Sequence, residues 1–346
     1  MLRSPIPLAR EGSLPADATD WVPARRAELV ALGIFFTLVI LVSDLINVRP
    51  GIEFCIVMVS IAGVAISRLG MQFLRDWWFF LVGMVMWNLS GPVAAQSPFP
   101  WHLDFMYNTD RSMFLGHSPV AMLHDAMHPG GSLGPLDYLT AAGYNLHLPE
   151  PFIVSYFLWR LNRAIFFQFV AATLLLLVIG LIVFILFPAV PPWLAGQPLV
   201  RFEGQYLKPW VAAASGYPGG LHAAWQHTRV LLPDITNRFS LVLASHPLPF
   251  VGSPLFYIFK FRGDQVAAFP SEHAAFPLLE YFAIRAAVPG IAWAMALWVL
   301  FVLFTIVYLG EHWVTDALAG YVLAIVVWMF VRWYTARRSA QTTGTG

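Results

Sequence analysis

Eight stretches of 15 to 24 mainly apolar residues limit the folds that are available to this chain. A stretch of this kind crosses a bilayer as a helix, because in lipid each backbone group must find its hydrogen bond within the protein. The chain is 58% hydrophobic and 11% charged, whereas a soluble domain carries about 25% charged residues. We predict an all-α integral membrane protein of about eight transmembrane helices, at residues 29–46, 52–66, 77–94, 136–159, 165–187, 266–287, 291–309 and 313–333.

Arginines in the short loops predict how these helices are oriented. Lysine and arginine are enriched in short loops on the cytoplasmic side. Eight spans place both termini on one side, and the short loops of the other side hold only Arg49. The basic residues of the first side are Arg25, Arg26, Arg68, Arg75, Arg160, Arg163, Arg285, Arg332, Arg337 and Arg338. We therefore expect a multi-pass protein of the cell membrane, with both termini cytoplasmic and residues 95–135 and 188–265 outside.

Charge and cysteine content exclude some classes of function. The formal net charge of +1 argues against nucleic acid as a partner. Cys55 is the single cysteine, so the chain has no internal disulfide framework. Residues 1–27 are polar and do not have the pattern of a secretory signal peptide. We interpret them as a cytoplasmic tail.

Two histidine motifs lie two spans apart in the last third of the chain. The sixth span contains "PSEH", with Ser271 and His273, and the eighth begins at "GEHWVTDALAGY", with His312 and Asp316. Residues four apart share one face of a helix. The 39 residues from His273 to His312 cover two crossings and a tight turn, so both histidines are expected at the outer face of the membrane.

Two histidines, a carboxylate and two converging helix N-termini suit phosphoryl transfer, because helix N-termini attract phosphate. His312 can attack phosphorus, Asp316 can bond its other ring nitrogen, and His273 can protonate the leaving oxygen. Ser271 and nearby backbone N–H groups can hold phosphate oxygens. The alternative is structural: a serine before an apolar run is usually an N-cap, and a histidine at a membrane interface can be merely amphipathic.

These motifs resemble a known family. "PSEH" and "HWVTD" are similar to the P-S-x-H and H-x-x-x-D motifs of the type 2 phosphatidic acid phosphatase superfamily. The resemblance implies a phosphohistidine mechanism with His312 as nucleophile, Asp316 as its partner and His273 as acid and base. "FPAVPPWLAG", "VAAFPSEHAAFPLL" and "YLGEHWVTDALAG" more closely resemble its inositolphosphotransferase branch, which includes the fungal inositol phosphorylceramide synthases. The similarity covers residues 140–335.

The chain departs from that family in its cations. Thr305 and Ile306 stand where the third motif normally has Ser-Arg, and no K-x6-R-P motif is present. Reduced cation motifs are also found in head-group transferases such as the sphingolipid synthases. We expect substitute substrate-binding cations in the outer loop, at Arg262, Lys260, Lys208 or Arg201; solvated loop charges are the alternative.

Five further polar residues are candidates for functional roles. Glu272 is unusual beside a phosphate site, since it repels the substrate unless it faces away or bonds a hydroxylated acceptor. The ionisable side chains of His147 and Glu150 cost free energy to bury inside a membrane, and such residues are usually functional. We place His147 among the substrate-binding residues; packing at a helix kink is the alternative. His124 and His128 have metal-ligand spacing without a clear third ligand, so a metal site there is the weaker interpretation.

The resemblance implies a lipid phosphotransferase that uses no metal or other cofactor, with its active site on the extracytoplasmic side. Its partners would be the bilayer and a lipid phosphate, phospholipid or sphingolipid substrate. A phosphatase with water as acceptor, or an inactive transporter or scaffold of the same fold, remains an alternative. The oligomeric state stays open. The expected organisation is a cytoplasmic tail (1–27), accessory helices with an outer interfacial segment (28–135), a helical-bundle catalytic membrane domain (136–335) and a disordered tail (336–346).

Overall fold

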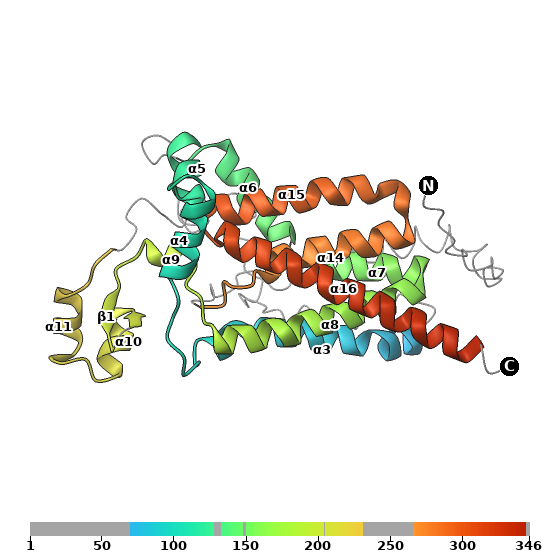
Figure 1. The fold of residues 1–346 in the computed structure, drawn as a ribbon, viewed down its shortest axis with the longest axis horizontal. Coiled ribbons are helices and arrows are strands. Elements are labelled where there is room, and N and C mark those ends of the chain that lie inside the picture. Colours follow the sequence, from blue (N-terminus) through green and yellow to red (C-terminus); the bar gives the residue numbers. More distant parts are fainter. Residues whose placement is uncertain (1–69, 128–132, 148–149, 204, 231–265, 344–346) are drawn as a thin grey trace, which may run out of the picture. The chain divides into compact units, whose positions relative to one another are not determined.

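The computed structural model describes residues 70–127, 133–147, 150–203, 205–230 and 266–343 (Figure 1). The chain divides into two units, and of the first, residues 1–78 and 253–258, the structure describes residues 70–78. The account below concerns the second unit, residues 79–252 and 259–346. Several predictions fall outside the described residues: the spans at 29–46 and 52–66, Cys55, His128, Lys260 and Arg262.

Helices make up most of the described residues. In chain order they are α3 (Gly70–Ala94), α4 (Asp104–Met113), α5 (Pro119–Met127), α6 (Pro135–His147), α7 (Glu150–Leu161), α8 (Arg163–Leu186), α9 (Pro192–Ala195), α10 (Pro209–Ala214), α11 (Gly220–Gln226), α14 (Glu272–Ala287), the 3-10 helix η2 (Pro289–Ile291), α15 (Ala292–Tyr308) and α16 (Val314–Thr343). A short antiparallel pair, β1 (Val200–Phe202) and β2 (Gln205–Leu207), lies between α9 and α10.

Four of these helices are long and apolar enough to cross a bilayer, at Gln72–Ala94, Arg163–Leu186, Pro289–Tyr308 and Val314–Gln341. Large apolar side chains are exposed along them, among them Leu297, Leu300, Val322 and Met329. Such a surface suits lipid rather than water. The predicted all-α membrane fold is thus confirmed, whereas the number of eight spans is not.

Helix α14 lies at the centre of the described bundle (Figure 1). It packs against α7, α8, α15 and α16, while α8 also packs against α16, and α15 against α6. Small residues bring α14 and α16 close together: a Cβ atom added at Gly320 would overlap the carbonyl oxygen of Ser271. The contact fixes the start of α14 against the first turns of α16, which is where the histidine motifs lie.

Some predicted elements differ from the observed helices. Helix α16 runs to Thr343, so residues 336–343, which were predicted to be a disordered tail, are helical. Residues 266–271 do not continue α14 because their backbone pairs elsewhere: Ala189 N–H donates to the carbonyl of Val266 at 2.9 Å, and Ala268 N–H donates to the carbonyl of Ala189 at 3.3 Å. The predicted span 136–159 is two helices, α6 and α7. Pro149 lies between them in the sequence, and proline disfavours a continuous helix at this point.

Candidate active site

The turn between α15 and α16 positions His312. Helix α15 ends at Tyr308, and Gly310 then takes a φ of 78°, a left-handed conformation that glycine adopts without strain. The carbonyl of Ile306 accepts hydrogen bonds from the N–H groups of Glu311 at 2.9 Å and His312 at 3.1 Å. These bonds hold the His312 backbone just before α16 begins.

One nitrogen of the His312 imidazole is engaged, and no hydrogen bond of the other, Nε2, is recorded among the described residues. Nδ1 lies 3.1 Å from the carbonyl oxygen of Ala268 and 3.6 Å from Oδ2 of Asp316. A carbonyl only accepts, so Nδ1 carries the hydrogen and Nε2 presents a lone pair. Asp316 is fully buried; its Oδ2 accepts from Trp313 N–H at 3.0 Å, and its Oδ1 has no hydrogen-bond partner among the described residues.

Burial lowers the pKa of His312 to about 3, although the bond to the Ala268 carbonyl opposes the shift and His147 adds to it. A lowered pKa means that the ring is neutral at pH 7, since protonation requires a pH near or below that value. His312 is therefore available as an uncharged nucleophile across the physiological range.

The first turn of α14 brings His273 to the same place. The Oγ of Ser271 accepts from Ala274 N–H at 3.1 Å and caps the helix, and Ser271 N–H donates to the carbonyl of Asp316 at 2.9 Å. The ring centroids of His273 and His312 are 5.4 Å apart. The predicted pair of histidines is thus adjacent, and Ser271 has the N-cap role that was the alternative to phosphate binding.

A third histidine completes the cluster. His147, at the end of α6, is fully buried, and its Nε2 lies 3.0 Å from Nδ1 of His273. Its Nδ1 lies 3.4 Å from Oε2 of Glu150, the first residue of α7. The Tyr144 hydroxyl lies 3.5 Å from Nε2 of His273. The structure therefore places His147 against the predicted acid–base residue.

Asp110 on α4 is a residue of the site that the sequence analysis missed. Its Oδ1 accepts from Thr315 N–H at 2.8 Å and from the Thr315 hydroxyl at 2.6 Å, and its Oδ2 accepts from Val314 N–H at 3.0 Å. Burial raises the pKa of Asp110, and these bonds partly oppose the shift. The N–H groups that begin α16 are thus engaged by Asp110 and Asp316, which differs from the expectation that they hold phosphate.

The remaining predicted residues lie in other surroundings. The amine of Lys208 is hydrogen-bonded to Oε1 of Gln197, and burial lowers its pKa. The buried side chain of Glu272 lies against Gly180 of α8. His124 is buried, and its Nε2 is 2.7 Å from the carbonyl of Tyr308. Within the described ranges no three potential ligands are grouped so that they could hold a metal ion.

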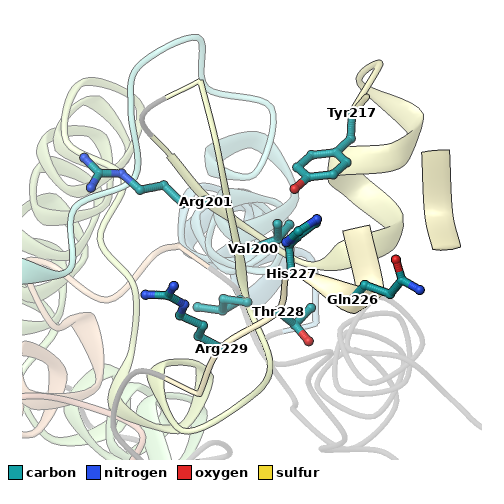
Figure 2. Close-up of a pocket in the computed structure, with 8 residues that line it drawn as sticks. Val200, Arg201, Tyr217, Gln226, His227, Thr228 and Arg229 are labelled. Carbon is teal, nitrogen blue, oxygen red and sulfur yellow. The ribbon is translucent and has the colours of Figure 1, made fainter. Parts of the chain in front are cut away.

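A cavity of about 480 Å³ lies next to the β1–β2 pair (Figure 2). In Figure 2, the guanidinium groups of Arg201 and Arg229 lie on one side of the cavity residues, and Tyr217 and Gln226 lie on the other. The lining residues are Leu199, Val200, Arg201, Tyr217, Gln226, His227, Thr228 and Arg229, and none of these eight is acidic. Arg201, one of the candidate cations, is therefore part of a basic cavity.

Comparisons with known proteins agree with the motifs. A model of the PAP2 superfamily matches residues 106–330, which is more than half of the chain. The inositol phosphorylceramide synthase catalytic subunit aur1 of Schizosaccharomyces pombe is 26% identical over 200 residues, or 57% of this chain. That match spans 40% of the relative's own length. No solved structure matches the chain. The chain belongs to the PAP2 superfamily, within which its motifs and this relative place it near the inositolphosphotransferase branch.

Proposed function

We propose that this protein is a membrane-embedded phosphotransferase, which moves a phosphate or phospho-head-group from a lipid donor through a phosphohistidine on His312. The observation that supports this most is the state of the His312 ring, whose Nδ1 is engaged by the Ala268 carbonyl, so that Nε2 carries the lone pair that attacks. His273 lies beside it, with 5.4 Å between the ring centroids.

The proposed reaction has two steps. In the first, the Nε2 lone pair of His312 attacks phosphorus, the bond from phosphorus to the leaving oxygen breaks, and His273 gives that oxygen a proton. In the second, the hydroxyl oxygen of an acceptor attacks the phosphohistidine, the N–P bond breaks, and His273 takes the hydroxyl proton. The Ala268 carbonyl and the Asp316 carboxylate stabilise positive charge on the His312 ring during both steps.

An alcohol is the acceptor that we favour, because the yeast relative is named as an inositol phosphorylceramide synthase. With water as the acceptor, the protein would be a lipid-phosphate phosphatase. Without catalytic activity, it would be a transporter or scaffold. The presence of His273, His312 and Asp316 argues against the last possibility. Roles for Ser271, Arg262, Lys260 and Lys208 in holding the head group belong to the same proposal, and Lys208 is the weakest of them because its amine is already bonded to Gln197.

Purified protein supplied with lipid donors that carry a labelled phospho-head-group should transfer label to a lipid alcohol and keep its activity in EDTA. The histidines, rather than a metal ion, supply the nucleophile and the proton. Thin-layer separation of labelled lipid from free phosphate distinguishes the acceptors. Label released only as free phosphate would make the protein a phosphatase. Activity that EDTA abolishes and a divalent ion restores would contradict the metal-independent mechanism.

Cysteine labelling tests the proposed outward orientation of the site. Ser112 and Ser339 are both exposed. Ser112 lies on α4, which Asp110 ties to the start of α16 near His312, and Ser339 lies near the far end of α16. In a Cys55→Ser background, Ser112→Cys should react with a membrane-impermeant maleimide on intact cells. Ser339→Cys should react only after permeabilisation. The reverse pattern would place the histidines in the cytoplasm.

A further inference from the structure

A line of buried polar side chains leads from His273 into the apolar interior. It runs from Nδ1 of His273 to Nε2 of His147 at 3.0 Å, and from Nδ1 of His147 to Oε2 of Glu150 at 3.4 Å. The carboxyl group of Glu280, two turns along α14 from His273, is fully buried, and neither of its oxygens has a hydrogen-bond partner among the described residues. Ionisable groups at membrane depth are expensive to bury and are usually functional.

Each nitrogen in this line can have only one of two roles. If Glu150 is ionised, it accepts the hydrogen on Nδ1 of His147, so Nε2 of His147 accepts the hydrogen on Nδ1 of His273. Nε2 of His273 is then a base. If Glu150 is protonated, both rings carry their hydrogen on Nε2, and Nε2 of His273 is an acid. The state with protonated Glu150 holds one proton more than the other, and both rings stay neutral in each.

We propose that Glu150 and His147 form a proton relay that switches Nε2 of His273 between acid and base, an inference that rests on the phosphotransfer proposed above. When Nε2 of His273 gives its proton to the leaving oxygen, Nδ1 takes one from Nε2 of His147. Nδ1 of His147 takes one from Glu150, which becomes a carboxylate. Attack by the acceptor alcohol reverses every transfer, so the cycle neither gains nor loses a proton.

The surroundings explain why a relay is preferable to an imidazolium on His273. The His147 side chain is fully buried, and a charge held in an apolar interior without a close counter-charge is costly. The relay avoids this cost, because both rings stay neutral and only the carboxyl group of Glu150 changes its charge. In this scheme Glu150 and His147 act through His273 and do not touch the substrate.

The test measures phosphoenzyme formation in a single turnover, in mixtures of H₂O and D₂O. The relay moves several protons together. A plot of the wild-type rate against the fraction of deuterium should therefore be curved rather than linear. Glu150→Gln should lower the rate about 100-fold and make the dependence linear, with little change in KM. Glu203→Gln is the matched control, because Glu203 is exposed between β1 and β2 and no contact with the three histidines is recorded for it in the described part of the chain. A linear dependence in the wild type, or a curve that survives in Glu150→Gln, would overturn the relay.

A second measurement needs neither turnover nor a variant. In wild-type protein with ¹⁵N-labelled histidine, the relay requires neutral rings at His147 and His273, with the hydrogen on the same type of nitrogen in both. An imidazolium at His273 at pH 7, or opposite tautomers in the two rings, would contradict it. If no lipid donor is turned over, the proposed function fails, and this measurement still decides whether the relay exists.

Discussion

His312→Ala is expected to abolish phosphotransfer, with a loss of at least about 10⁴-fold, because the variant has no atom that can attack phosphorus. The protein should still be made and inserted, since the turn before α16 is held by Gly310 and by backbone bonds to Ile306 rather than by the imidazole. The measurement combines turnover of a labelled donor with trapping of the acid-labile phosphoenzyme, which should be missing in the variant.

His117→Ala serves as the control for this substitution. His117 is an exposed histidine between α4 and α5, and no hydrogen bond of its side chain is recorded within the described part of the chain. The control should match the wild type in yield, turnover and phosphoenzyme. Near wild-type turnover in purified His312→Ala would end the phosphohistidine proposal.

Gly320→Ala is expected to separate α14 from α16 and to remove most of the activity. The new Cβ would overlap the carbonyl oxygen of Ser271 and lie 3.1 Å from its carbonyl carbon. Backbone atoms cannot rotate away as a side chain can, so the helices must move apart. This movement would stretch the bond from Ser271 N–H to the Asp316 carbonyl and enlarge the 5.4 Å separation of the His273 and His312 rings. A misplacement of about 1 Å can lower a rate about 100-fold.

Gly290→Ala is the matched control for the close contact. A Cβ atom added at Gly290 meets no heavy atom within 4 Å, and its φ lies outside the left-handed range. Thermal unfolding in detergent and turnover should be measured for both variants. The two alanine variants should differ clearly. Equal melting temperatures and equal turnover would mean that the α14–α16 contact does not position the histidines.

The sequence predicts the membrane fold well because its signals are local. A helix such as α8 is apolar on every side over 24 residues, and no distant contact is needed to recognise it. The prediction was wrong where distant backbone groups compete with helix formation, as at Val266 and Ala268, which bond to Ala189 instead. The prolines of "HLPEP" (residues 147–151) indicate the separation of α6 from α7, yet the sequence could not show that each helix is too short to cross a bilayer alone.

The candidate site was likewise predictable where its signals are local in the sequence and not where they depend on distant contacts. The spacing of His312 and Asp316, and the two-span distance to His273, can be read from the sequence, and the family membership they indicate is confirmed. The carbonyl of Ala268, which fixes the tautomer of His312, cannot be predicted, because any residue has a carbonyl and only the three-dimensional fold chooses this one. His147 was a candidate because an ionisable residue inside a membrane is costly to bury. Its contact with His273 could not be predicted, because it comes from the packing of α6 and α7 around α14.

The cap that Asp110 places on α16 also sets an order of events during synthesis. Its carboxylate bonds to Thr315, which is 205 residues further along the chain. A ribosome adds about 5 to 20 residues per second, so about 10 to 40 seconds separate the synthesis of the two partners. A nascent chain with α4 and α14 already inserted still lacks the second histidine and the helix that Asp110 caps. The three-histidine cluster can therefore form only with the last membrane helix, and a chain cut short before residue 312 has none of the proposed chemistry.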